Sequence, residues 1–315
     1  MLSPSTSRNL TKNCQCLCLV SVVVLILSGL MLAQQPGQKT FASPDEAAQA
    51  LFVAVQAGDQ TALLEVFGPS GNEIISSGDP VQDKNSQEKF VAQYREMHRV
   101  AHEPDGTVTL YVGAENWPVP VPLVKAGSGW RFDTETGKRE VLYRRIGRNE
   151  YAAIDICAAL VGAQNDYFSQ SRDGKVQQYA QTFTSDEGKH NGLYWKASDG
   201  EPESPIGPLV ADAAGAGYHQ PPSDEPGPFH GYLFRILTAQ GAGAPGGAKN
   251  YMVNGNMTGG FAFLAYPAEY RSSGVMTFIV NQTGVIYQKD LGAKTAEIAG
   301  TMKEYSPDKT WKKAE

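Results

Sequence analysis

Apolar residues recur at helical spacing in the part of the chain that follows residue 42. Ser43, Pro44 and Glu46 form a capping-box pattern, which predicts a helix that starts here. Gly58 and Asp59 end this helix and start a second one. The apolar positions of the two helices are Ala47, Leu51, Ala54, Val55, Leu63, Leu64, Val66 and Phe67. Their spacing predicts that both helices cover a core.

The period of the apolar positions then changes from helical to alternating. A third helix is expected at 86–100, followed by strands at 107–113, 117–125 and 130–132, with a turn at 127–129. The strand at 117–125 has a proline at every second position, which only an edge strand tolerates. Helices followed by such a meander predict an α+β layer packing.

A second unit of the same class follows. Asn149 is expected to cap an amphipathic helix of about five turns. A long irregular insertion at 172–230 comes next, and strands are expected at 232–236 and 260–266 with a hairpin at 276–288. Loops of such length inside a compact domain are often functional.

These patterns divide the chain into consecutive parts of different character. A linker is expected at 34–42, an α+β domain at 43–143 and a second α+β domain at 149–305. Residues 306–315 form a basic tail, which we expect to be frayed and solvated.

The first 33 residues have the order of an export signal. Arg8 and Lys12 precede a nearly pure apolar run at 17–33, and Ala33 is followed by small and polar residues. This order predicts a signal peptide cleaved after Ala33. An uncleaved anchor is the alternative, because the run is at the short limit for spanning a bilayer. Both interpretations place residues 40–315 outside the inner membrane, either released into the periplasm or medium or anchored and facing the periplasm.

Composition and charge narrow the class of protein. Apolar residues make up 41% and charged residues 19% of the chain, which is typical of a globular protein. The net charge is −6, and removing Arg8 and Lys12 with an acid-free leader makes it −8. An acidic, unclustered surface argues against nucleic acid as a partner. Only Cys157 remains after the leader, so the chain depends on its core without a disulfide, and we expect no metal and no cofactor.

Candidate catalytic residues gather in the irregular insertion. They are His190, His219, His230, Glu187 and Asp224. Three histidines with nearby acids are able to form an acid–base site when a folded loop brings them together. They lack the helix-spaced patterns that fix such geometry locally, so solvated or hydrogen-bonded loop histidines are the alternative.

Aromatic and amide side chains of the same region are candidates for ligand binding. They are Asn191, Tyr194, Trp195, Tyr218 and Tyr232. Aromatic rings beside polar groups stack on sugar rings, but core packing is the commoner role of such residues.

Three short motifs of the second half carry a family resemblance. His190–Trp195, His230–Tyr232 and Gly259–Phe263 are similar to an exported bacterial family described as domain of unknown function 2950. The resemblance covers nearly all of the mature chain and implies an envelope location. It implies no activity, cofactor or catalytic residue.

Two weaker resemblances concern the fold. The segment 117–133 resembles the sheet of the nuclear-transport-factor-2-like superfold, whose members include enzymes and interaction modules alike. The second half resembles the globular heads of pseudopilins and type IV pilins. It departs from them because its helix follows another domain and carries Asp155 and Asn165.

The sequence therefore favours a non-catalytic envelope protein that binds a protein or a cell-wall glycan. The alternative is an envelope hydrolase that uses the region 186–230, and a third hypothesis is assembly through the pilin-like half. Membrane contact is expected only through residues 17–33, if they are not cleaved. The oligomeric state and the presence of an enzymatic activity stay open.

Overall fold

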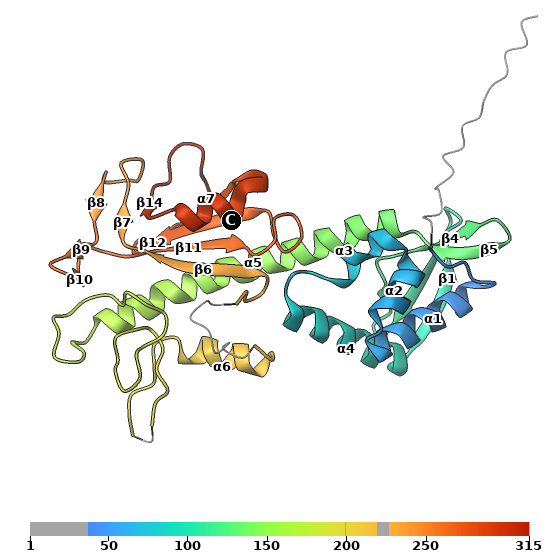
Figure 1. The fold of residues 1–315 in the computed structure, drawn as a ribbon, viewed down its shortest axis with the longest axis horizontal. Helices are drawn as coiled ribbons and strands as arrows, with labels where there is room; N and C mark the ends of the chain where they lie inside the picture. Colours follow the sequence, from blue (N-terminus) through green and yellow to red (C-terminus); the bar gives the residue numbers. More distant parts are fainter. Residues whose placement is uncertain (1–36, 199, 219–226, 315) are drawn as a thin grey trace, which may run out of the picture. The chain divides into compact units, whose positions relative to one another are not determined.

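A computed structural model describes residues 37–198, 200–218 and 227–314 (Figure 1). The predicted leader at 1–33 and the candidate residues His219 and Asp224 lie outside the described residues. Residues 35–315 form one compact unit with helices and antiparallel sheets, which confirms the α+β class.

The N-terminal half combines helices with a small sheet. Its helices are α1 (Pro44–Ala57), α2 (Gln60–Phe67), η1 (Pro69–Gly71), α3 (Asn72–Ile75) and α4 (Pro80–Glu96). Its strands are β1 (His98–His102), β2 (Val108–Val112), β3 (Trp117–Pro118), β4 (Leu123–Ala126) and β5 (Gly129–Phe132). The sheet is antiparallel in the order β1-β2-β4-β5, with β3 paired to β2. Helices and sheet enclose a core that includes Leu51, Phe67, Leu110, Leu123 and Phe132.

Local sequence signals account for the first helices. The Ser43 hydroxyl accepts from the Glu46 backbone N–H at 3.1 Å, and the Glu46 carboxylate accepts from the Ala42 backbone N–H at 3.0 Å. The predicted capping box is therefore confirmed. The expected third helix at 86–100 is wrong at both ends. It starts at Pro80 after Asp79, whose side chain accepts from the Gln82 backbone N–H, and β1 takes the residues from His98 onward.

The expected helix start at Asn149 is wrong. Helix α5 (Thr134–Phe168) is 35 residues long and is capped by Asp133. Asn149 is fully buried in its middle, so the predicted boundary between 143 and 149 falls inside one helix. Charged side chains hide the apolar period of the first turns: Glu135, Lys138, Arg139, Glu140, Arg144, Arg145 and Arg148.

The C-terminal half is built on a five-stranded antiparallel sheet. Its strands are β6 (Tyr232–Leu237), β11 (Ala262–Pro267), β12 (Met276–Asn281), β13 (Ile286–Asp290) and β15 (Lys312–Lys313), in the order β15-β13-β12-β11-β6. The predicted strands at 232–236 and 260–266 and the hairpin at 276–288 are confirmed. Helix α5 contacts β12 and β11, and helix α7 (Thr295–Thr301) contacts β11 (Figure 1).

Smaller elements surround this sheet. Strands β14 (Glu304–Tyr305), β7 (Ala239–Gln240) and β8 (Lys249–Asn250) form a second sheet, and β9 (Met252–Val253) pairs with β10 (Asn256–Met257). The remaining elements are η2 (Gly292–Lys294) and α6 (Gly207–Gly215), which lies in the irregular insertion. None of the helices in the described ranges combines the length and the apolar character that a bilayer-spanning segment needs.

Two segments that were expected to be unstructured are part of the fold. Phe41 is 2% exposed and bridges to Trp130, and the buried Gln38 amide donates to the Phe132 carbonyl at 2.8 Å, so the linker prediction fails from residue 38. The tail prediction also fails, because Lys312 and Lys313 pair with β13. Both segments complete a sheet edge, which a local pattern does not reveal.

Candidate functional site

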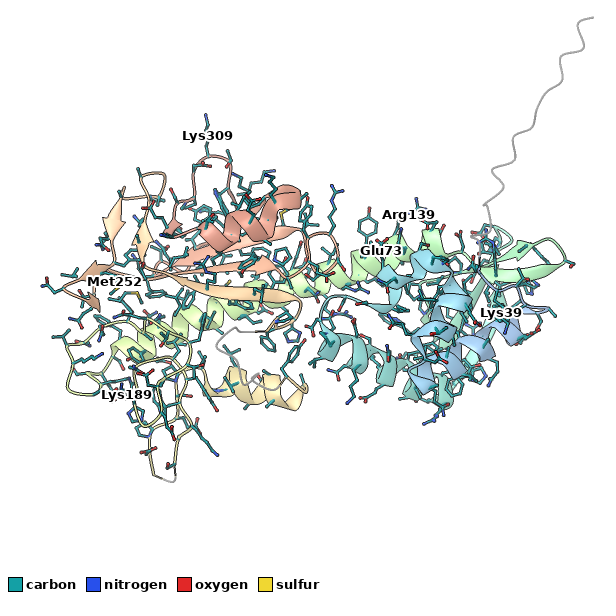
Figure 2. All side chains as sticks on the ribbon, in the orientation of Figure 1. Lys39, Glu73, Arg139, Lys189, Met252 and Lys309 are labelled. Carbon is teal, nitrogen blue, oxygen red and sulfur yellow. The ribbon has the colours of Figure 1, made fainter. Side chains whose placement is uncertain are left out.

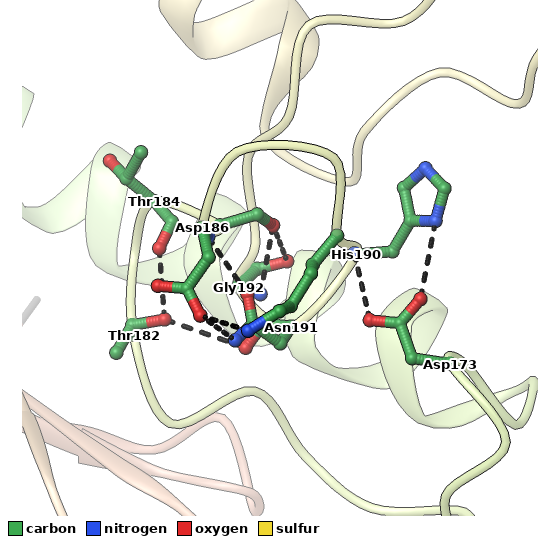
Figure 3. A network of polar contacts seen from close by, with 9 residues as sticks. Asp173, Thr182, Thr184, Asp186, His190, Asn191 and Gly192 are labelled. Carbon is green, nitrogen blue, oxygen red and sulfur yellow. Dashed lines mark hydrogen bonds and ion pairs between the residues drawn. The ribbon is translucent and has the colours of Figure 1, made fainter.

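His190 lies in a folded turn of the insertion rather than in a catalytic cluster (Figure 3). Its backbone N–H donates to Asp173 Oδ2 at 2.9 Å, and its Nδ1 lies 3.6 Å from Asp173 Oδ1. Its ring meets the Trp195 ring edge to face, with centroids 4.7 Å apart. These contacts hold the turn against the body of the protein.

The Asn191 amide is also engaged within this turn (Figure 3). Its Nδ2 donates to Asp186 Oδ2 at 2.8 Å, and its Oδ1 accepts from the Asp186 backbone N–H at 2.9 Å. Hydrogen bonds from Lys189 and then from Asn191 lower the pKa of Asp186. Glu187 is exposed beside them. The arrangement therefore closes a loop and engages both ends of the Asn191 amide within it.

Three of the candidate aromatic residues pack on the core. Trp195 is buried and donates from Nε1 to the Pro202 carbonyl at 3.0 Å. Tyr232 is fully buried and donates to the Met276 carbonyl at 2.9 Å. Tyr194 is half-buried and packs against the same core. Core packing is therefore the role that the structure gives these rings.

Tyr218 and His230 lie at a junction where the insertion meets helix α4. The Tyr218 hydroxyl donates to Asp79 Oδ2 at 2.7 Å and accepts from the His230 backbone N–H at 3.3 Å. The Gly231 backbone N–H donates to the same Asp79 oxygen at 3.1 Å. Burial, then Asp79, raises the pKa of Tyr218, while burial lowers the pKa of His230. Asp79 thus joins the two halves of the unit.

Helix α5 contributes a second set of buried polar contacts to this junction. The Asn149 amide donates to the Ser273 carbonyl at 2.9 Å and accepts from Gln82 Nε2 at 2.8 Å. The Arg145 guanidinium donates to the carbonyls of Ile74 and Ser76 at 3.0 and 3.1 Å. Sequence reasoning missed this role of Asn149 and Arg145, because their partners are distant in the chain. Their contacts assign them to the stability of the fold.

The described candidates for catalysis have separate surroundings. His190 contacts Asp173 and Trp195, whereas His230 contacts Tyr218 and Phe229. Within the residues that the structure describes, no group of three His, Cys, Asp or Glu side chains is arranged to hold a metal ion. Cys157 is buried, and burial raises its thiol pKa to about 12, which makes it a poor nucleophile.

A groove of about 700 Å³ lies elsewhere, between helix α5 and the edge of the five-stranded sheet. It is lined by Gly147, Glu150, Tyr151 and Ile154 of α5 and by Phe278, Gln288, Lys312 and Lys313 of the sheet. This groove exists because β15 extends the sheet beside the helix. Sequence reasoning missed it, since residues 306–315 were expected to be a frayed tail.

The side chains of the groove are aromatic and cationic. Tyr151 is 69% exposed. Lys312 and Lys313 are exposed, and neither forms an ion pair with any part of the chain that the structure describes. Glu150 is the acid among the lining residues, and its single negative charge against two lysines leaves the lining with a net positive charge. Its Oε1 accepts from the backbone N–H groups of Val275 and Met276 at 2.9 and 3.0 Å. The groove therefore suits a ligand with flat apolar faces and negative charge.

Comparison with known proteins identifies the family. No curated protein and no solved structure matches the chain, so the two weaker fold resemblances stay predictions. The model of one family matches residues 38–314, which covers both halves of the compact unit. The chain belongs to the family described as Protein of unknown function (DUF2950).

Proposed function

We propose that this protein is an exported, non-catalytic binding module whose ligand is a carboxylate-bearing cell-wall glycan. The observation that carries the proposal is the groove between α5 and β15, whose lining includes the exposed Tyr151 and the strand residues Lys312 and Lys313.

The two kinds of side chain supply complementary interactions. A tyrosine ring packs its apolar face on the C–H face of a sugar and keeps its hydroxyl in water. Lysine ammonium groups attract carboxylates, and each exposed pair contributes about 0–1 kcal/mol and weakens with salt. We therefore expect modest affinity with a clear dependence on ionic strength.

The leader sequence supports the envelope location. Arg8, Lys12 and the apolar run at 17–33 have the order of an export signal, and cell-wall glycan lies outside the inner membrane. No observation on the described residues favours the hydrolase alternative, since His190 and His230 have separate partners. We place the ligand in the groove because the Tyr151 ring and the lysine ammonium groups of the groove are accessible to solvent.

Co-sedimentation with purified, insoluble peptidoglycan tests the proposal. The protein used comprises residues 35–315, the compact unit with both cores. Tyr151→Ala is expected to weaken binding about tenfold, in the range of an aromatic anchor at an interface. The double variant Lys312→Gln with Lys313→Gln is expected to weaken binding at low salt and to flatten its salt dependence.

Lys309→Gln is the matched control for the lysine variants. Lys309 is exposed in the segment that precedes β15, points outward in Figure 2 and does not line the groove. Binding of this variant is expected to equal that of the unmodified protein. Failure to sediment with peptidoglycan, equal binding of all variants, or capture of a defined protein without glycan binding would each overturn the proposal.

A further inference from the structure

We infer that the glycan site continues from the groove along helix α5 to Tyr143, so that its ligand is an extended oligosaccharide rather than a single terminal sugar. This inference rests on the proposed function. It adds that the ligand is an oligosaccharide and that Tyr143 contacts it.

Helical periodicity places Tyr143 on the face of α5 that lines the groove. Tyr143, Gly147, Glu150 and Ile154 follow one another at intervals of four, three and four residues. Residues at these intervals lie on one side of an α-helix. Tyr143 and Tyr151 are two turns apart, which corresponds to about 12 Å along the axis.

Exposed rings gather on this part of the molecule. Tyr143 is 75%, Tyr151 69% and Trp117 54% exposed. Among the described residues, these are the exposed tyrosine, tryptophan and phenylalanine side chains. Isolated exposed apolar residues are ordinary on a protein surface. Here Tyr143 and Tyr151 share one helix face and Trp117 contacts the same helix, so the three rings form an exposed aromatic surface along α5.

Trp117 is held against α5 by an arginine. The Arg144 guanidinium lies 5.8 Å from the centre of the Trp117 ring. It also donates to the Pro118 carbonyl at 3.2 Å and pairs with Glu140 at 2.8 Å. A ring held in this way loses little conformational freedom on binding.

Gly147 lies between Tyr143 and Tyr151 on helix α5, and its lack of a side chain leaves the helix backbone open to solvent there. A Cβ at this position would meet nothing within 4 Å, so packing does not demand glycine there. A glycine inside a helix costs about 1 kcal/mol relative to alanine. A ligand that lies on both rings passes over Gly147, and a larger side chain would obstruct it. The separation of the rings and this open stretch favour an extended, charged glycan.

Titration with soluble peptidoglycan glycan strands of defined length tests the inference. The probes are one disaccharide and a strand of four disaccharides, and the readout is the dissociation constant by calorimetry. The long strand is expected to bind at least tenfold more tightly to the unmodified protein. Tyr143→Ala is expected to remove this difference and to leave the affinity for the disaccharide unchanged.

Gly147→Gln is expected to weaken binding of the long strand about tenfold. Gly162→Gln is its matched control, because Gly162 lies on the same helix, is exposed, has nothing within 4 Å of its Cβ position and does not line the groove. Equal affinity for both lengths, or no effect of Tyr143→Ala, would overturn this inference alone if Tyr151→Ala still weakens both probes. Absence of binding to either probe would overturn both proposals.

Discussion

Two faces of helix α5 have different roles in this protein. Arg145 and Asn149 of helix α5 are buried and tie the helix to loops from both halves of the unit. Tyr143, Gly147 and Tyr151 lie on the other side of the same turns, and both tyrosine rings are exposed. The comparison teaches that residues for folding and candidate residues for binding alternate along one helix.

The physical basis of the difference is the cost of leaving a group without its partner. A buried polar group that loses its hydrogen bond destabilises the fold by about 1–3 kcal/mol. An exposed ring that is truncated changes stability by less than about 0.5 kcal/mol, because water replaces its contacts. Substitutions on the two faces therefore separate loss of stability from loss of binding.

Asn149→Leu is expected to cause the largest loss of stability. It removes the partner of two buried groups, Gln82 Nε2 and the Ser273 carbonyl. The free energy of unfolding in urea should fall by about 3 kcal/mol. The control is Asn165→Leu at an exposed position of the same helix, which should change it by less than about 0.5 kcal/mol. Equal effects of the two variants would contradict the role of Asn149.

Gly231→Ala is expected to have the next largest effect. Gly231 has a φ of +73°, and a Cβ there would lie 2.5 Å from Asn149 Nδ2. The left-handed backbone costs about 1–2 kcal/mol for alanine, and the clash adds to it. Gly255→Ala is the control, with a φ of +78° and nothing within 4 Å. Chemical denaturation should show a clearly larger loss for Gly231→Ala, and equal losses would mean that the junction adjusts freely.

Tyr218→Phe is expected to cost about 1.5 kcal/mol at pH 7, because its hydroxyl donates to the Asp79 carboxylate. Burial, then Asp79, raises the pKa of Tyr218 above 10.0, so the folded protein holds the phenolic proton more tightly than the unfolded chain does. This contribution is complete below pH 10 and is lost as the pH rises above 10. Denaturation from pH 8 to 11 should show the difference between protein and variant shrinking, and a constant difference would contradict the assignment.

Tyr151→Ala should leave the free energy of unfolding within about 0.5 kcal/mol of the unmodified value, because the ring is 69% exposed. The same variant should bind peptidoglycan about tenfold more weakly, so it separates loss of binding from loss of stability. Parallel urea unfolding and co-sedimentation check this expectation. A loss of stability as large as that of Asn149→Leu would show that Tyr151 belongs to the fold.

Local signals in the sequence predicted much of the fold. The capping box at Ser43 and Glu46 and the hairpin at 276–288 involve neighbouring residues, and the structure contains both. The start of α5 was missed, since charged side chains obscure its period before Asn149. Strand β15 was missed because two lysines show no strand pattern by themselves.

The candidate site was predicted less well, and particular residues show why. Trp195 and Tyr232 have the residue type of a sugar platform, but burial against the core takes their rings out of reach. Tyr218 was named from its type, whereas its partner Asp79 is 139 residues away in the chain. No local pattern singles out the Tyr151 ring, because the exposure of a side chain is not encoded by its neighbours in the chain.

The sequence by itself determined the α+β class, the family, and the strands at 232–236, 260–266 and 276–288, since periodicity, caps and turns depend on residues close in the chain. Only the tertiary structure decided which side chains share a surface. Pairing of β15 with β13 places Lys312 and Lys313 in the lining of the same groove as Tyr151, and folding of the insertion brings Tyr218 to Asp79. Such contacts join distant segments, and their energy depends on burial and geometry that no local pattern contains.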